Sequence, residues 1–124
     1  MFEHKERILL FDKNKTEFNN IQKVLREHGF QKIIEASSED DVVAKASALN
    51  PEVVILDETE EGDVLRVIKV LKNFTAHIIL MTKFDKEITA PEVLWDDDGL
   101  STISGIMDKN QDFYSLVRLV EDVC

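Results

Sequence analysis

Short apolar runs alternate with longer segments of helical spacing along the chain. The runs are bounded by polar residues and occupy positions 8–11, 33–36, 53–56, 78–81 and, more weakly, 103–107. Those at 8–11, 53–56 and 78–81 are continuous, whereas Glu35 interrupts the second run. Because neighbouring positions in a strand point to opposite faces of a sheet, runs that are apolar at every position need cover on both faces. The pattern therefore predicts a parallel sheet with helices on both sides.

The segments between the runs carry apolar residues three and four positions apart, which predicts amphipathic helices. The first helix begins after Asn14, which resembles a capping box with Glu17, and it ends at Gly29. The second begins after Ser38 and must end before Pro51, because the residue before a proline disfavours helix. Further helices are expected at about 63–72, from Pro91 through Trp95, and from Phe113 to Val123.

Strands and helices that alternate in this way predict an α/β fold with a doubly wound, five-stranded parallel sheet. We expect the strand order 2-1-3-4-5, in which ligands bind beyond the carboxyl ends of the first and third strands. No repeat, linker or low-complexity tract interrupts the alternation. Residues 1–124 are therefore interpreted as a single domain.

Charge and composition exclude several classes of function. The chain has 15 Lys and Arg residues against 25 Asp and Glu residues, and this net charge of −10 opposes binding to nucleic acid or to acidic membrane surfaces. The single cysteine, Cys124, cannot form an intramolecular disulfide, which fits a reducing compartment. The first apolar run is too short for a signal peptide, and no later run approaches the length of a membrane span. We therefore expect a cytoplasmic protein.

Reactive side chains follow four of the five predicted strands. Asp12 follows the first strand, Asp57 the third and Thr82 the fourth, and Lys109 lies just past the fifth. Because the carboxyl ends of parallel strands meet at one edge of the sheet, these side chains should converge. The sequence thus predicts a crevice with two carboxylates, one hydroxyl and one ammonium group.

Four segments carry a resemblance to a known family. They read ILLFDKN at 8–14, PEVVILD at 51–57, HIILMT at 77–82 and ISGIMDK at 103–109. In this order, and over nearly the whole chain, they resemble the receiver domain of two-component response regulators. The resemblance implies a flavodoxin-like (βα)5 fold and a signalling domain in a phosphorelay rather than an enzyme.

The resemblance also implies roles for individual residues. Asp57 would be the phosphoacceptor, Asp12 a residue of the acidic pocket, and Thr82 and Lys109 the groups that contact the phosphoryl oxygens. A Mg²⁺ ion would be held by Asp12, Asp57 and the backbone carbonyl of Thr59. The chemistry is consistent with these roles, because an Asp carboxylate can attack phosphorus once cations neutralise the charge between them.

Lys13 is the most consequential departure from the family. Receivers usually carry a second acidic residue at this position, where it is a direct metal ligand, whereas this chain reads Asp12-Lys13. One interpretation is that the Lys13 ammonium lies against Asp12 and Asp57, so that it weakens Mg²⁺ binding or replaces the metal charge altogether. The alternative is that Lys13 points outward into solvent.

Two further departures concern signalling. Glu58 is the first of three carboxylates within residues 58–61, and they either oppose phosphorylation or restore some affinity for a cation. Ile106 stands at an altered switch position, where the family commonly has Tyr or Phe. The sequence therefore predicts the fold more firmly than the switching.

Three functions follow as hypotheses. In the first, Asp57 accepts phosphate from a histidine kinase or phosphotransfer protein. The chain then docks a downstream protein through the face formed by the predicted fourth helix, fifth strand and last helix, with Trp95 as a candidate anchor. The second is a phosphorylation-independent pseudo-receiver, in which Lys13 fixes one state. The third, an unrelated small-molecule binder of the same fold class, would need a ligand pocket that the sequence does not indicate.

Overall fold

The part of the chain that the structure describes forms one five-stranded parallel sheet. The structure, a computed structural model, describes residues 4–58, 63–82, 103–109 and 113–124. The strand order is β2-β1-β3-β4-β5, which confirms the predicted topology. The strands are β1 (His4–Phe11), β2 (Phe30–Ala36), β3 (Val53–Asp57), β4 (His77–Thr82) and β5 (Ile103–Asp108). Each strand extends beyond its apolar run, because backbone pairing continues into polar residues at its ends.

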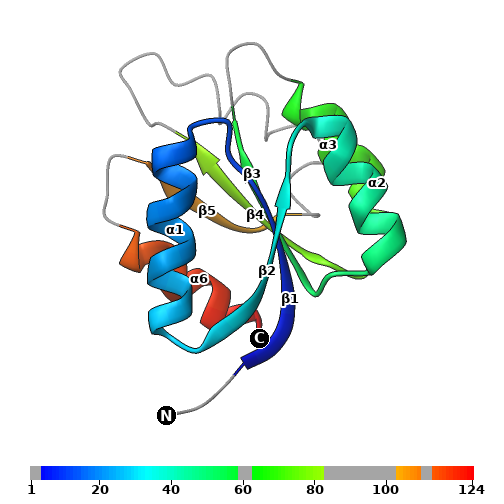
Figure 1. The fold of residues 1–124 in the computed structure, drawn as a ribbon. Helices are drawn as coiled ribbons and strands as arrows, with labels where there is room; N and C mark the ends of the chain where they lie inside the picture. Colours follow the sequence, from blue (N-terminus) through cyan, green and yellow to red (C-terminus); the bar gives the residue numbers. More distant parts are fainter. Residues whose placement is uncertain (1–3, 59–62, 83–102, 110–112) are drawn as a thin grey trace.

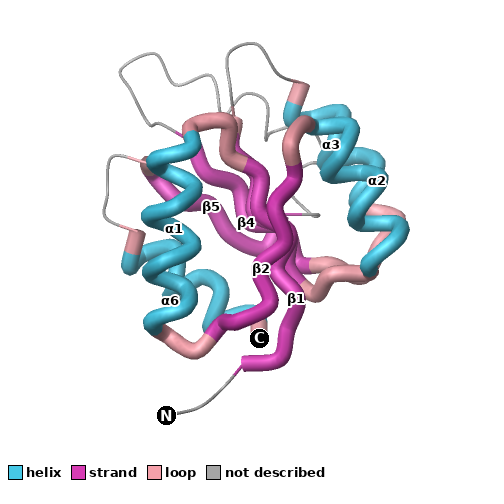
Figure 2. Tube along the Cα trace, in the orientation of Figure 1, coloured by secondary structure: helices cyan, strands magenta, loops and turns pink. Residues whose placement is uncertain are grey.

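Helices cover both faces of the sheet. Those described are α1 (Lys15–Glu27), α2 (Glu39–Leu49), α3 (Val64–Leu71) and α6 (Tyr114–Val123). Helices α1 and α6 lie on one face, and α2 and α3 lie on the other (Figures 1 and 2). The helix expected from Pro91 to Trp95 lies outside the described residues. None of the helices in the described ranges has the length and apolar character needed to cross a membrane.

The apolar runs fill two cores, one on each face of the sheet. In β1, Ile8 and Leu10 pack into the cluster that includes α1 and α6, whereas Leu9 and Phe11 pack into the cluster that includes α2 and α3. All four side chains are buried. This two-sided burial is the physical reason why the central strands are apolar at consecutive positions.

Local signals set the ends of the first two helices. The Asn14 side chain accepts a hydrogen bond from the Glu17 backbone N–H at 3.0 Å, and Ser38 accepts one from the Asp41 N–H at 3.0 Å. Helix α1 gives way to Gly29, whose φ of 94° is accessible to glycine at little cost. Helix α2 ends at Asn50 in the left-handed conformation, directly before the proline.

Strand register brings the carboxyl ends of the central strands level with one another. Phe11 pairs with Leu56 across β1 and β3, and Asp57 pairs with Met81 across β3 and β4. Thr82 in turn pairs with Asp108 on β5. The residues that end these strands, or directly follow them, therefore share one edge of the sheet.

Candidate functional site

The buried polar side chains gather at this edge. Among the described residues, the buried polar or charged ones are Asp12, Asp57 and Thr82, with 5%, 3% and 1% of their surface exposed. The side chain of Lys109, directly after β5, is 10% exposed. Buried charges are rare unless they are paired or bind a ligand. This edge is therefore the candidate functional site.

The Lys109 ammonium links two carboxylates. Its Nζ lies 2.5 Å from Asp57 Oδ1 and 2.6 Å from Glu17 Oε1. Burial acts to lower the pKa of Lys109, but the hydrogen bonds to Asp57 and Glu17 outweigh it and the net pKa is raised. Lys109 is therefore charged at neutral pH and supplies a fixed cation beside Asp57.

Glu17 is a site residue that the sequence interpretation missed. Only one of the two hydrogen bonds of the predicted capping box forms, the one from the Glu17 N–H to the Asn14 side chain. The Asn14 backbone N–H donates to Asp12 Oδ1 at 2.9 Å and not to the Glu17 carboxylate. The Glu17 carboxylate instead lies against Lys109, since an ion pair with a buried ammonium is stronger than a hydrogen bond to an exposed backbone amide. Its position in the sequence could have indicated this role, because Glu17 lies in the first turn of a helix that begins close to Asp12.

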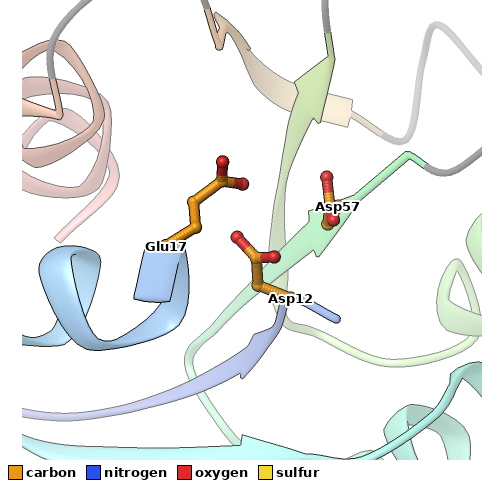
Figure 3. A group of neighbouring side chains, drawn as sticks. All are labelled: Asp12, Glu17 and Asp57. Carbon is orange, nitrogen blue, oxygen red and sulfur yellow. The ribbon is translucent and has the colours of Figure 1, made fainter. Parts of the chain in front are cut away.

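Three carboxylates form a cluster that could hold a metal ion. Asp12, Glu17 and Asp57 each offer an oxygen, and these oxygens lie within 4.8 Å of one another (Figure 3). Asp12 Oδ2 is buried and has no hydrogen-bond partner among the described residues. Burial, together with the neighbouring Glu17 and Asp57 carboxylates, raises the pKa of Asp12 to about 8. An orphaned oxygen in an all-oxygen cluster fits a hard divalent cation such as Mg²⁺.

Two opposing effects act on the pKa of Asp57. Burial raises its pKa, and the hydrogen bond and charge of Lys109 only partly offset this effect. The Lys109 ammonium is paired with this carboxylate, and the Asp12 and Glu17 side chains lie close to it (Figure 3). A further negative charge here would meet strong repulsion unless a second cation joined Lys109.

Thr82 has a partner from the same edge of the sheet. Its Oγ1 donates a hydrogen bond to Glu58 Oε1 at 2.7 Å. The Glu58 backbone N–H donates to the Met81 carbonyl at 2.9 Å, which extends the pairing of β3 and β4 by one residue. Of the three carboxylates within 58–61, only Glu58 lies in the described residues, and it is directed toward the hydroxyl.

Three other residues that the sequence singled out lie in different surroundings. Lys13 is exposed, so the buried ammonium beside Asp57 is that of Lys109. Ile106 is partly buried and packs against the core on the α2 and α3 face. Thr59 lies outside the described residues, so its carbonyl as a metal ligand stays a prediction.

Several solved structures with this architecture are described as response regulators or their receiver domains. Neither a protein-family model nor a curated protein matches the sequence. A DNA-binding response regulator of the LuxR family from Staphylococcus aureus superposes with a TM-score of 0.79 at 20% identity, over 95% of this chain and 98% of that one. The receiver domain of the response regulator NarL from Mycobacterium tuberculosis superposes at 0.78 and 18% identity, over 96% and 95%.

A third match extends the comparison to a CheY-like protein. The receiver domain from Methylobacillus flagellatus has a TM-score of 0.76 and 14% identity, over 96% of this chain and 98% of that one. Both the strand order and the helical cover agree with these structures across almost the full length of the chain. The chain therefore has the CheY-like fold of response-regulator receiver domains, in a divergent sequence.

Proposed function

We propose that the chain is a signalling receiver that accepts a phosphoryl group on Asp57. One observation carries the proposal: a buried carboxylate at the end of β3 is held 2.5 Å from the Lys109 ammonium, beside a cluster suited to a divalent cation. A carboxylate beside an ammonium group and a cation-binding cluster suits phosphoryl transfer, because the reaction depends mainly on positioning and charge stabilisation.

The phosphoryl donor is a phosphohistidine of a partner histidine kinase or phosphotransfer protein. A carboxylate oxygen of Asp57 attacks the phosphorus, the P–N bond breaks, and the imidazole nitrogen leaves with the electron pair and takes up a proton. The product is an acyl phosphate on Asp57 and a neutral histidine. Lys109 stabilises the added charge, and Thr82 is the hydroxyl available to hydrogen-bond a phosphoryl oxygen.

Magnesium fits this site. Asp12, Asp57 and Glu17 would hold it, together with the predicted carbonyl of Thr59. When bound, the ion supplies positive charge between the attacking carboxylate and the phosphoryl oxygens. This role is consistent with the orphaned Asp12 Oδ2 and with the position of the Asp12 side chain between Glu17 and Asp57 in Figure 3.

Paired charge changes should move Mg²⁺ affinity in opposite directions. Glu17→Gln is expected to weaken binding about tenfold, because it removes one anionic ligand. Lys13→Asp is expected to strengthen it by a similar factor, since it restores a carboxylate to the acidic pair. Isothermal titration calorimetry measures both, with Glu27→Gln at the exposed end of α1 as the charge-matched control. Unchanged affinity in Glu17→Gln would contradict the ligand role, and unchanged affinity in Lys13→Asp would place that side chain away from the metal.

The output of this receiver is a docking event with a downstream protein. The proposed face includes β5 and α6, on which Tyr114 is 51% exposed and makes an edge contact with His28 at 5.6 Å between ring centroids. Exposed aromatic side chains are frequent anchors of protein interfaces. The anchor expected from the sequence, Trp95, lies outside the described residues.

A pseudo-receiver that works without phosphate is the second candidate function. The observation that favours it is the double pairing of Lys109, whose ammonium already has two anionic partners in Asp57 and Glu17. Such a pairing would hold the site in one arrangement through charges of the chain itself. In this case the interaction face would be permanently available.

Phosphorylation of the isolated chain separates the two functions. The wild type and Asp57→Asn are incubated with Mg²⁺ and acetyl phosphate, and their intact masses are measured. We expect the wild type to gain the mass of one phosphoryl group and Asp57→Asn to gain nothing. No gain in either protein would favour the pseudo-receiver, and an equal gain in both would exclude Asp57 as the acceptor.

A further inference from the structure

The hydroxyl proposed to contact the phosphoryl group is already engaged. Thr82 is 1% exposed, and its Oγ1 donates to Glu58 Oε1 at 2.7 Å. A threonine hydroxyl has a single proton to donate. It can therefore serve either the Glu58 carboxylate or a phosphoryl oxygen on Asp57, but not both.

The backbone holds Glu58 in position for this contact. Glu58 directly follows Asp57, and its N–H is bound to the Met81 carbonyl at 2.9 Å. On the other side of Thr82, the Lys109 N–H donates to the Thr82 carbonyl at 2.8 Å. Both partners of the hydrogen bond thus sit on paired backbone. The two side chains differ in access to water, since Thr82 is buried and Glu58 is partly exposed.

We propose that Glu58 is a built-in competitor of the phosphoryl group for Thr82, which rests on the proposed function of Asp57. The carboxylate and a phosphoryl oxygen are both anionic acceptors, so each suits the same donor. A phosphoryl group adds up to two negative charges to a crevice that already contains Asp12 and Glu17. Formation of the phosphorylated state therefore requires Glu58 to leave Thr82 for solvent.

Beryllofluoride, a non-covalent stand-in for the phosphoryl group, tests the competition directly. Its affinity in the presence of Mg²⁺ is measured by ¹⁹F NMR for the wild type, Glu58→Met and Glu58→Gln. Methionine removes the charge and the competing oxygen, and we expect it to strengthen binding about tenfold. Glutamine keeps an oxygen that accepts from Thr82, so its gain should be smaller. Glu121→Met, on the exposed surface of α6, controls for the change in net charge.

A double-mutant cycle with Thr82→Val distinguishes competition from a merely structural role. Where Thr82 is present, Glu58→Met releases a donor for the anion. In the Thr82→Val background there is no donor to release, so the tenfold gain should shrink to the smaller effect of charge alone. Circular dichroism establishes that each variant is folded before its affinity is compared.

Each outcome either supports or overturns the competition between Glu58 and the phosphoryl group. A gain in Glu58→Met that collapses in the Thr82→Val background supports competition, as does binding that appears only in Glu58→Met. Equal affinity in Glu58→Met and the wild type overturns the competition and leaves the phosphoacceptor role of Asp57 intact. A gain that persists undiminished in the Thr82→Val background also overturns it. Absence of binding in the wild type and in both Glu58 variants overturns the competition and the proposed function together.

Discussion

Lys109→Met is expected to lower the free energy of unfolding by about 3 to 5 kcal/mol near pH 8. The ammonium is 10% exposed and lies between Asp57 and Glu17, so its loss leaves buried carboxylates without their cation. Methionine keeps most of the side-chain volume, which limits the contribution of lost packing. Chemical denaturation measures the difference, and the exposed Lys23→Met on α1 should change stability by less than about 0.5 kcal/mol.

The loss should shrink as the pH falls. Without the ammonium, the carboxylates of the crevice bind protons more readily, so their repulsion is relieved in acid. We therefore expect a smaller difference between Lys109→Met and the wild type near pH 5 than near pH 8. A loss of the same size at both values would assign the effect to packing, and a loss under about 1 kcal/mol would contradict the ion pair.

Asp12→Asn is expected to raise the free energy of unfolding by about 1 to 3 kcal/mol near pH 8. The pKa of Asp12 is raised from 3.8 to about 8 in the folded protein, mainly by burial. Between these two values the folded state keeps a proton that the unfolded state has lost. The contribution of Asp12 to stability therefore falls as the pH rises through this range. Asparagine is neutral throughout and avoids this cost.

The pH dependence supplies the sharper readout for this variant. Thermal unfolding of the wild type and Asp12→Asn should converge near pH 4 and diverge toward pH 8, with the variant more stable. The same variant should bind Mg²⁺ more weakly, because it loses an anionic oxygen from the cluster. If the stabilities of the two proteins changed in parallel with pH, Asp12 would not be the group whose titration lowers the stability of the wild type. Residues that bind a ligand often lower the stability of the folded protein, and they are retained because function needs them.

The fold was predictable because the same apolar pattern recurs in each of its central strands. Each central strand is apolar on both faces, and only a sheet covered on both sides satisfies several such strands at once. The same logic located Asp12, Asp57, Thr82 and Lys109, because residues at the ends of parallel strands share an edge whatever their distance in sequence.

The partners of these residues were not predictable in the same way. Glu17 fits a capping box by local spacing, and only the distant Lys109 reveals that its carboxylate has a stronger partner. The sequence left two roles open for Glu58, which were to oppose phosphorylation or to restore affinity for a cation. Its contact with Thr82 depends on the pairing of β3 with β4. Side-chain direction is set by tertiary neighbours, which spacing along the chain does not encode. The metal-ligand carbonyl of Thr59, the docking role of Trp95 and the single-domain organisation stay predictions.

The structure of the protein with Mg²⁺ and beryllofluoride tests the central claim most directly. We expect the beryllium on an Asp57 carboxylate oxygen, with its fluorines in contact with Lys109 Nζ and Thr82 Oγ1, and the Glu58 carboxylate turned away from Thr82. Beryllofluoride bound elsewhere, or an Asp57 carboxylate that remains paired with Lys109 and binds no beryllofluoride at saturating concentration, would contradict a phosphoacceptor role for this crevice.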